Sequence, residues 1–163
     1  SIEWTAKKVT GQHNGTIKLA SGQLELKGGA LNTGSFLIDM NSIVNLDLKG
    51  DKNQDLVKHL KSDDFFAVEK NPTSQFVITK LMPVGADRID ITGNLTIKGI
   101  TQPITFPASI KMQGDVIVAV AKGVKVDRTK YDIKFRSKNF FINIGDKAID
   151  DEFELAINLV AKK

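Results

Sequence analysis

The sequence predicts an all-β protein: an antiparallel barrel of about eight strands with one short helix, in a single domain over residues 1–163. Three observations favour this fold. Apolar and polar residues alternate with a period of two along most of the chain, as in strands buried on one face. Turn-forming residues separate these segments at short intervals, which indicates a barrel or a sandwich of sequential strands. A length of 163 residues suits one hydrophobic core.

The clearest alternation lies in the second half of the chain. It runs from Ile89 to Ile97, from Ile104 to Met112 and from Phe153 to Ala161. Pro107 falls on the outer face and donates no backbone hydrogen bond, so it indicates an edge, a bulge or a bend. Weaker alternation predicts the other strands, namely one around Trp4 and the segments Gly15–Leu19, Gln23–Lys27, Gly34–Val44, Ser74–Leu81, Asp115–Val126 and Tyr131–Phe135.

Turn residues mark the joints between these strands. Lys98–Pro103 joins two strong strands through a short loop, so those strands should be antiparallel neighbours. Shorter turns are expected at Asn14–Gly15, Ser21–Gly22, Gly28–Gly29 and Gly114–Asp115. Within Asp115–Val126, the alternation assigns one apolar face to Val116, Val118, Val120, Val124 and Val126.

One segment, Gly50–Phe66, breaks the strand pattern. Leu56, Val57 and Leu60 have the spacing of a short amphipathic helix. Asp51 or Asn53 is expected to cap its start. Two consecutive aromatic residues follow, Phe65 and Phe66. We expect them to close one end of the core, with a lid over a ligand as the alternative.

The sequence offers little for catalysis. There is no cysteine, and neither His13 nor His59 has the spacing of a metal site. The chain lacks GxSxG, GxGxxG and P-loop motifs. The acidic residues at 63–64 and 150–152 are adjacent in sequence and are read as solvated ends or caps. Arg128 stands out among twenty lysines and three arginines. It is expected to pair with an acidic residue such as Asp64, or else to meet a ligand headgroup. We therefore expect no enzymatic activity and no cofactor.

The charge pattern indicates a solvated surface. The net charge is +4, from 23 basic and 19 acidic residues, and the basic residues are scattered. Nucleic-acid binding would require a basic stripe with exposed aromatic residues, and the sequence has none. Transient contact with an anionic membrane surface is compatible with this charge.

The inner face of the predicted barrel is apolar and has few polar anchors. An eight-stranded barrel is either filled by its side chains or just wide enough for one small ligand. A greasy lining suits a hydrocarbon chain, which gains about 0.8 kcal/mol per buried methylene. The residues thus favour a long apolar ligand.

Several motifs resemble the YceI-like family over essentially the whole chain. They are Trp4, His13–Asn14–Gly15, HLKSDDFF at 59–66, Pro72, Phe76, GNLTIKGITQP at 93–103 and RTKYDI at 128–133. Asp132 departs from the pattern, since the family often has glycine there. We expect Asp132 to adopt the turn conformation of that glycine or to point outward. The segment 140–155 is similar to one subgroup with a longer loop between the last strands.

The resemblance implies a lipocalin-like barrel that binds, transports or stores a polyisoprenoid, an isoprenoid quinone, or a fatty acid or amide. It also implies export to the bacterial periplasm, with any signal peptide absent from this chain. An unpaired edge near Pro107 or the termini would support a homodimer. The ligand-binding residues are expected to be Phe36, Ile38, Met40, Leu60, Phe65, Phe66, Phe76, Ile78, Leu95, Ile97, Phe106, Ile133 and Phe135.

Two other functions stay open at this point. One is a structural or stress-response interaction protein with a packed barrel and no ligand. The other is an enzyme acting on a lipid, which would need ionisable groups that converge inside the barrel. A void of a few hundred cubic ångströms would favour the binding protein, and a filled core would favour the interaction protein.

Overall fold

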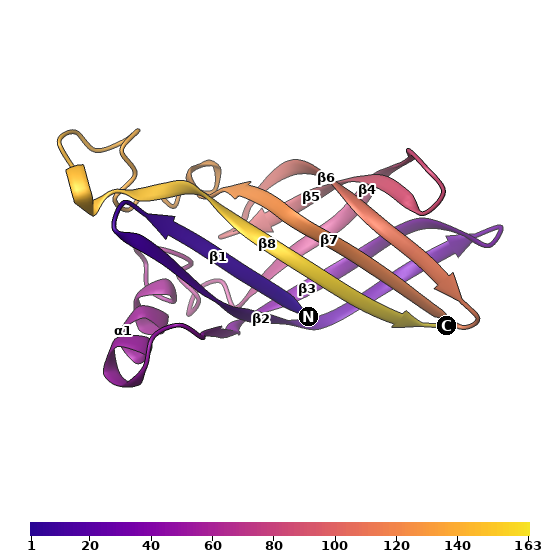
Figure 1. The fold of residues 1–163 in the computed structure, drawn as a ribbon, viewed down its shortest axis with the longest axis horizontal. Helices are drawn as coiled ribbons and strands as arrows, with labels where there is room; N and C mark the ends of the chain where they lie inside the picture. The colour runs from indigo at the N-terminus through magenta and orange to yellow at the C-terminus, as the bar shows by residue number, and fades with distance from the viewer.

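The computed structural model describes residues 1–163 and forms a closed barrel of eight antiparallel strands (Figure 1). Each strand pairs with its neighbours in sequence, and the last strand pairs with the first, which confirms the predicted fold class. The strands are β1 (Ile2–Lys8), β2 (Gly11–Lys27), β3 (Ala30–Asn45), β4 (Thr73–Pro83), β5 (Arg88–Ile97), β6 (Ile100–Gln113), β7 (Val116–Asp127) and β8 (Ile149–Lys162).

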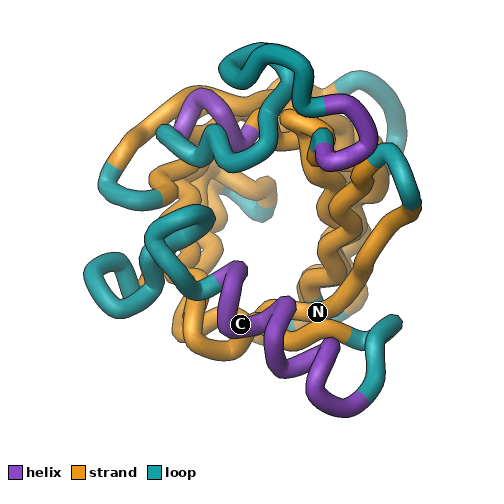
Figure 2. Tube along the Cα trace, turned by 90° about the vertical axis from the view of Figure 1, so that its left-hand side faces the viewer, coloured by secondary structure: helices purple, strands orange, loops and turns teal.

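Three helical segments accompany the barrel, and none is long and apolar enough to span a membrane. They are α1 (Gly50–Leu60) and two 3₁₀ turns, η1 (Arg128–Tyr131) and η2 (Gly145–Lys147). All three lie at one end of the barrel, here called the helix end (Figure 1). Figure 2 looks at this end and shows α1 along its lower rim. The tips of the β2–β3, β4–β5 and β6–β7 hairpins form the opposite end, called the hairpin end.

The tightest hairpin joins β5 and β6. Lys98 and Gly99 both have positive φ, 54° and 74°, as a two-residue hairpin turn requires. The turn is shorter than the predicted Lys98–Pro103 loop, and Ile100–Pro103 belong to β6. The predicted turns at Gly28–Gly29 and Gly114–Asp115 are confirmed.

Two predicted turns are wrong, because β2 is one long, bulged strand. Asn14–Gly15 and Ser21–Gly22 both lie inside it. Gly15 is required for close approach rather than for a turn. A Cβ there would lie 1.8 Å from the Val44 carbonyl oxygen and 2.6 Å from Cζ2 of Trp4. Glycine is therefore needed at position 15 because neighbouring strands pack closely against it, and not because the chain turns there.

The predicted inner face of β7 is wrong in its first half. Ile117, Ala119 and Ala121 line the cavity there together with Val120, whereas Val116 and Val118 do not. The pairing register with β8 shifts between Ala121 and Val124, around Gly123 with φ of 64°. An extra residue in a bulge reverses which face points inward. Beyond this bulge Val124 and Val126 are buried, as predicted.

The predicted strand Tyr131–Phe135 does not form. The chain instead makes η1 and then a left-handed residue, Asp132, with φ of 59°. This confirms that Asp132 supplies the turn for which the family often has glycine. It also removes the alternation that placed Ile133 and Phe135 on one face, because that argument applies only to a strand.

The sheet opens between β6 and β7 near Pro107. This proline is exposed and pairs with Asp90 of β5, but β6 pairs with β7 only from Ser109 onward. The predicted edge is therefore present on one side of β6. A homodimer through this edge stays a prediction.

A buried asparagine fixes α1 to the barrel. The Asn45 side chain donates to the Asn14 carbonyl, at 2.9 Å, and accepts from the Leu48 backbone N–H, at 3.0 Å. Asn53 donates to the carbonyls of Asn45 and Leu48, both at 2.8 Å. The predicted cap by Asp51 or Asn53 is wrong, because Lys49 occupies the cap position and Asn53 reaches back to these carbonyls instead. The helix accordingly turns Leu56, Val57 and Leu60 toward the core.

Candidate functional site

The barrel encloses an apolar cavity of about 230 Å³. Of the 38 residues that line it, 33 are hydrophobic. The strands supply them by alternation, as shown for β8, where Phe153, Leu155, Ile157 and Leu159 all face inward. The polar residues in the lining are Ser1, Ser74, Arg128, Asp150 and Asn158.

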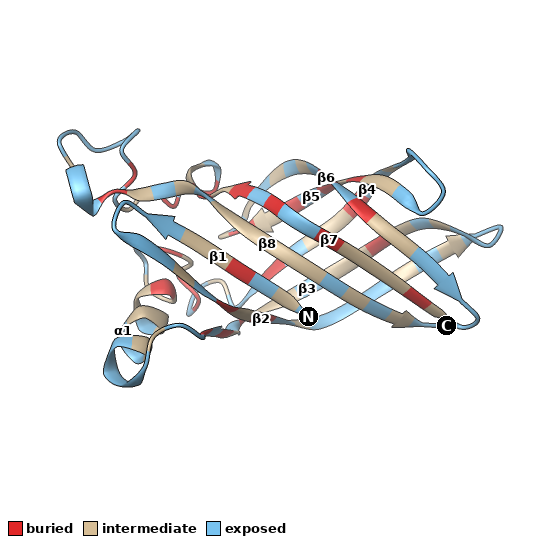
Figure 3. Cartoon of the chain, viewed as in Figure 1, coloured by how far each residue is buried: buried red, intermediate tan, exposed pale blue.

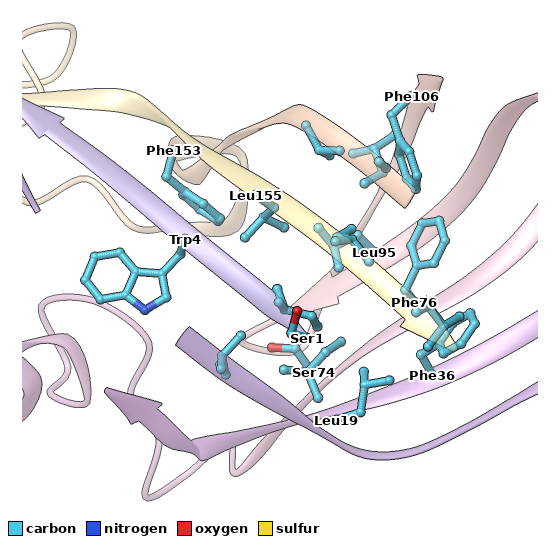
Figure 4. A pocket seen from close by; sticks show the side chains of 18 of the residues that line it. Ser1, Trp4, Leu19, Phe36, Ser74, Phe76, Leu95, Phe106, Phe153 and Leu155 are labelled. Atoms are coloured by element: carbon cyan, nitrogen blue, oxygen red, sulfur yellow. The ribbon is translucent and has the colours of Figure 1, made fainter. Parts of the chain in front are cut away.

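Aromatic rings form one wall of the cavity (Figure 4). Phe76 and Phe106 lie with ring centroids 5.7 Å apart. Gly93 makes room for this wall, because a Cβ there would lie only 2.4 Å from Cζ of Phe76. The small side chains of Ala108 on β6 and Ala121 on β7 leave the volume open.

A second hollow of about 400 Å³ lies at the hairpin end, between β2 and the end of β8. It shares five lining residues with the cavity, and lysines stand at its margin. The shared residues are Leu19, Leu24, Phe36, Ile117 and Leu159.

Leu60, Phe65 and Phe66 line the cavity at the helix end. Phe65 and Phe66 both face inward because they lie in a turn rather than in a strand. Phe65 packs against His59 and Phe135, with ring centroids 4.9 and 5.4 Å apart. Phe66 packs against Phe153 at 6.2 Å. The two aromatic residues thereby close this end of the core.

Arg128 is buried beside the cavity and holds the helix end together. Its Nε, Nη1 and Nη2 donate to the carbonyls of Asp150, Ile133 and Ile149, at 2.9, 3.0 and 3.0 Å. Burial lowers the pKa of Arg128 below its ordinary value, while the carboxylates of Asp151, Asp127 and Asp150 oppose that shift. The guanidinium nevertheless keeps its charge.

The predicted pairing of Arg128 with Asp64 is wrong. Asp64 accepts from His59 instead, at 2.9 Å, on the outside of the barrel. The reason is that backbone carbonyls near the two ends of the loop between η1 and β8 accept the hydrogen bonds of the guanidinium instead. Sequence patterns do not reveal such partners, since every residue has a carbonyl.

His13 likewise serves a structural contact. Its Nδ1 lies 2.7 Å from Asp47, which also accepts from the Asn14 backbone N–H and the Asn45 amide. Partial burial opposes ionisation of Asp47, but these hydrogen bonds and the charge of His13 outweigh it and lower the pKa from 3.8 to about 2. Neither histidine lines the cavity.

Eleven of the thirteen residues predicted to bind ligand line the cavity, and their contact with a ligand stays a prediction. They are Phe36, Ile38, Met40, Leu60, Phe65, Phe66, Phe76, Ile78, Leu95, Ile97 and Phe106. Ile133 and Phe135 do not line it, because the segment that carries them is not a strand. Ile133 is instead 1% exposed in the core, and Phe135 packs on Phe65.

Sequence reasoning missed part of the lining. Ala121 was hidden by the bulge in β7, and no motif pointed to Asp150. Trp4 is not among the residues predicted to bind ligand, yet it lines the cavity, and its Nε1 is buried without a hydrogen-bond partner. Its position inside the ring of strands depends on Gly15, a contact that the local pattern does not encode.

Residues 1–161 match the YceI-like domain family. The chain belongs to the YceI-like family. It is 52% identical over 58 residues to a UPF0312 protein of Pseudomonas aeruginosa strain LESB58, covering 36% of this chain and 30% of that protein. It is 35% identical over 107 residues to a UPF0312 protein of Pectobacterium atrosepticum, covering 65% of this chain and 54% of that one. The matches thus span about a third to a half of the curated relatives' length.

Two solved structures have the same fold. Burkholderia cenocepacia BcnA superposes with a TM-score of 0.79 at 20% identity, covering 99% of this chain and 95% of BcnA. A polyisoprenoid binding domain from Saccharophagus degradans, implicated in plant cell wall breakdown, superposes with a TM-score of 0.73 at 13% identity, covering 99% and 92%. At these identities the likeness concerns the fold.

Proposed function

We propose that this YceI-like protein binds a long apolar ligand, of the isoprenoid or acyl class, in the barrel cavity and serves as its carrier or store. The observation that carries the proposal is the lining, in which 33 of 38 residues are hydrophobic. Such a wall offers water too few partners for stable hydration. A hydrocarbon chain, in contrast, gains about 0.8 kcal/mol for each methylene that it buries.

The size of the cavity supports a bound ligand over a packed barrel. An unfilled apolar volume of this size deprives the lining side chains of van der Waals contacts that a hydrocarbon chain would supply. The polyisoprenoid binding domain of S. degradans, with the same fold, makes an isoprenoid the first ligand to test.

The ionisable groups favour binding over catalysis. Arg128 and Asp150 are the ionisable residues of the lining, and three of the Arg128 donors are taken up by backbone carbonyls. The remaining donors leave room for one polar headgroup at the helix end.

Export to the periplasm is part of the proposal, and fractionation of cells that express the natural gene would test it.

The first test is organic extraction of the purified protein followed by mass spectrometry, with a boiled and refolded sample as control. We expect a stoichiometric isoprenoid or acyl species that is absent after refolding. An empty extract, together with no uptake of decylubiquinone or cis-parinaric acid on titration, would favour the packed-barrel interaction protein instead.

A cavity-filling variant tests the location of binding. Ala121→Phe places a ring in the cavity, and we expect the affinity for cis-parinaric acid to fall at least tenfold. Ala20, exposed on β2, provides the matched control in Ala20→Phe, which should bind normally. Circular dichroism melts would establish that both variants fold. Unchanged affinity in a folded Ala121→Phe protein would place the ligand elsewhere.

A further inference from the structure

The loop between η1 and β8, residues 132–148, has a fixed base. Ser137 is fully buried, and its hydroxyl donates to Asp151. Asn139 donates to the same carboxylate. The Ile149 backbone N–H donates to the Arg136 carbonyl at 2.9 Å. The base is therefore an ordered part of the helix end, and it holds the rest of the loop in place.

The tip of the same loop exposes three consecutive apolar residues. Phe140 is 51% exposed, Phe141 50% and Ile142 92%. Figure 3 shows the loop projecting from the helix end as a largely pale blue segment. Single exposed apolar residues are common on proteins, but a contiguous cluster on an ordered loop marks a surface that meets something apolar.

Basic residues surround this apolar tip. The β1–β2 turn lies beside the loop, since the Val9 backbone N–H donates to the Ala148 carbonyl at 3.2 Å. Residues 7–9 and 132–148 together hold six basic side chains and two acidic ones, Asp132 and Asp146. Their net charge of +4 equals the net charge of the entire chain. The six are Lys7, Lys8, Lys134, Arg136, Lys138 and Lys147.

We propose that these two segments form a docking surface for an anionic lipid bilayer, into which Phe140, Phe141 and Ile142 insert. An apolar cluster with a basic surround is the combination that interfacial membrane binding uses. The cation of Lys134 lies 4.8 Å from the Phe140 ring centroid, so charge and apolar surface already adjoin. A second copy of this chain would explain the apolar tip but not the positive charge, because the same basic segments would repel one another.

Docking would bring one end of the cavity to the membrane. Ile149 and Asp150 follow the loop directly, and both line the cavity. The helix end would then face the bilayer. This inference goes beyond the proposed ligand binding, and vesicle binding can be measured without any cargo.

The test is co-sedimentation with phosphatidylcholine vesicles that contain or lack one quarter phosphatidylglycerol. We expect binding to the anionic vesicles, at least tenfold weaker binding to the neutral ones, and loss of binding in high salt. The triple variant Phe140→Ser, Phe141→Ser, Ile142→Ser should bind the anionic vesicles at least tenfold more weakly than the wild type. Its matched control is Val84→Ser, Met112→Ser, Val160→Ser, since these residues are also exposed.

Two further variants keep the proposal falsifiable. Lys134→Glu with Lys138→Glu should abolish the preference for anionic vesicles. Phe140→Trp should gain a blue-shifted emission component on anionic vesicles, which reports insertion. Equal binding by the wild type and the apolar triple variant would overturn the proposal. So would a wild type that ignores anionic vesicles and instead dimerises through the tip in sedimentation velocity.

Discussion

The two halves of the barrel bury their side chains differently. In the helix half, twelve residues form one buried cluster that includes Trp4, Phe65, Tyr131 and Ile133. In the hairpin half, the buried cluster has six members, and larger side chains such as Phe36 are only partly buried. The polar anchors Asn45 and Arg128 also lie in the helix half.

The difference indicates that one half of the barrel contributes more to the free energy of unfolding and the other more to the volume available for a ligand. Side chains that pack on one another contribute stability, whereas side chains that face a cavity forgo part of that contact. All six residues of the hairpin-half cluster line the cavity, whereas the helix-half cluster also contains four buried residues that do not line it, namely Val68, Val126, Tyr131 and Ile133. Substitutions in the first half should therefore affect unfolding, and substitutions in the second should affect binding.

The sharpest comparison pairs two phenylalanines. Phe65→Ala removes a buried ring that packs on two others, and we expect it to cost about 3–5 kcal/mol of the free energy of unfolding. Phe36→Ala removes a ring that is partly exposed to the cavity, so about 1–2 kcal/mol is expected. Urea unfolding of both variants measures the contrast. Equal losses would mean that the two halves are equally packed.

Arg128→Met tests the polar anchor. The variant leaves three buried carbonyls without their charged donor, and we expect a loss of about 3 kcal/mol. Affinity for cis-parinaric acid should change little, unless the ligand has an anionic head. Arg88→Met, at an exposed position, is the control. A loss below about 1 kcal/mol would contradict the anchoring role.

Asp47 gives the smallest expected effect and depends on pH. Its folded pKa of about 2 lies below the ordinary 3.8, so its contribution is present above pH 3.8 and is lost as the pH falls toward 2. Allowing for solvent screening, we expect Asp47→Asn to cost about 1 kcal/mol at pH 6 and almost nothing near pH 2. Urea unfolding from pH 2 to pH 6 measures this difference.

Local periodicity predicted most of the barrel. The strands with unbroken alternation, β5, β6 and β8, lie where the pattern placed them, and all but two of the predicted site residues face the cavity. The errors occur where an extra residue in a strand, or a close contact between neighbouring strands, determines the local structure. The bulge near Gly123 reversed the face of β7, and Gly15 looked like a turn although it accommodates Trp4.

Other features could not be predicted, because they depend on how distant segments meet. The partners of Arg128 are carbonyls, which every residue carries. The cavity volume depends on the sizes of facing side chains such as Ala108 and Ala121, whose meeting requires the strand register. The exposed apolar tip at Phe140 could not be predicted, because the base of its loop is held by a hydrogen bond between Ser137 and Asp151, which lie on opposite sides of the tip.

The pairing of β1 with β8 has a consequence for how the molecule forms. This ladder joins residues that are far apart in sequence, such as Ser1 and Asn158. Contacts of such long range form slowly, because the loop entropy must be lost before they contribute. We therefore expect the β1–β8 ladder to be the last of the eight to form when the protein refolds, so that the ring of strands, and with it the cavity, is completed in the final step.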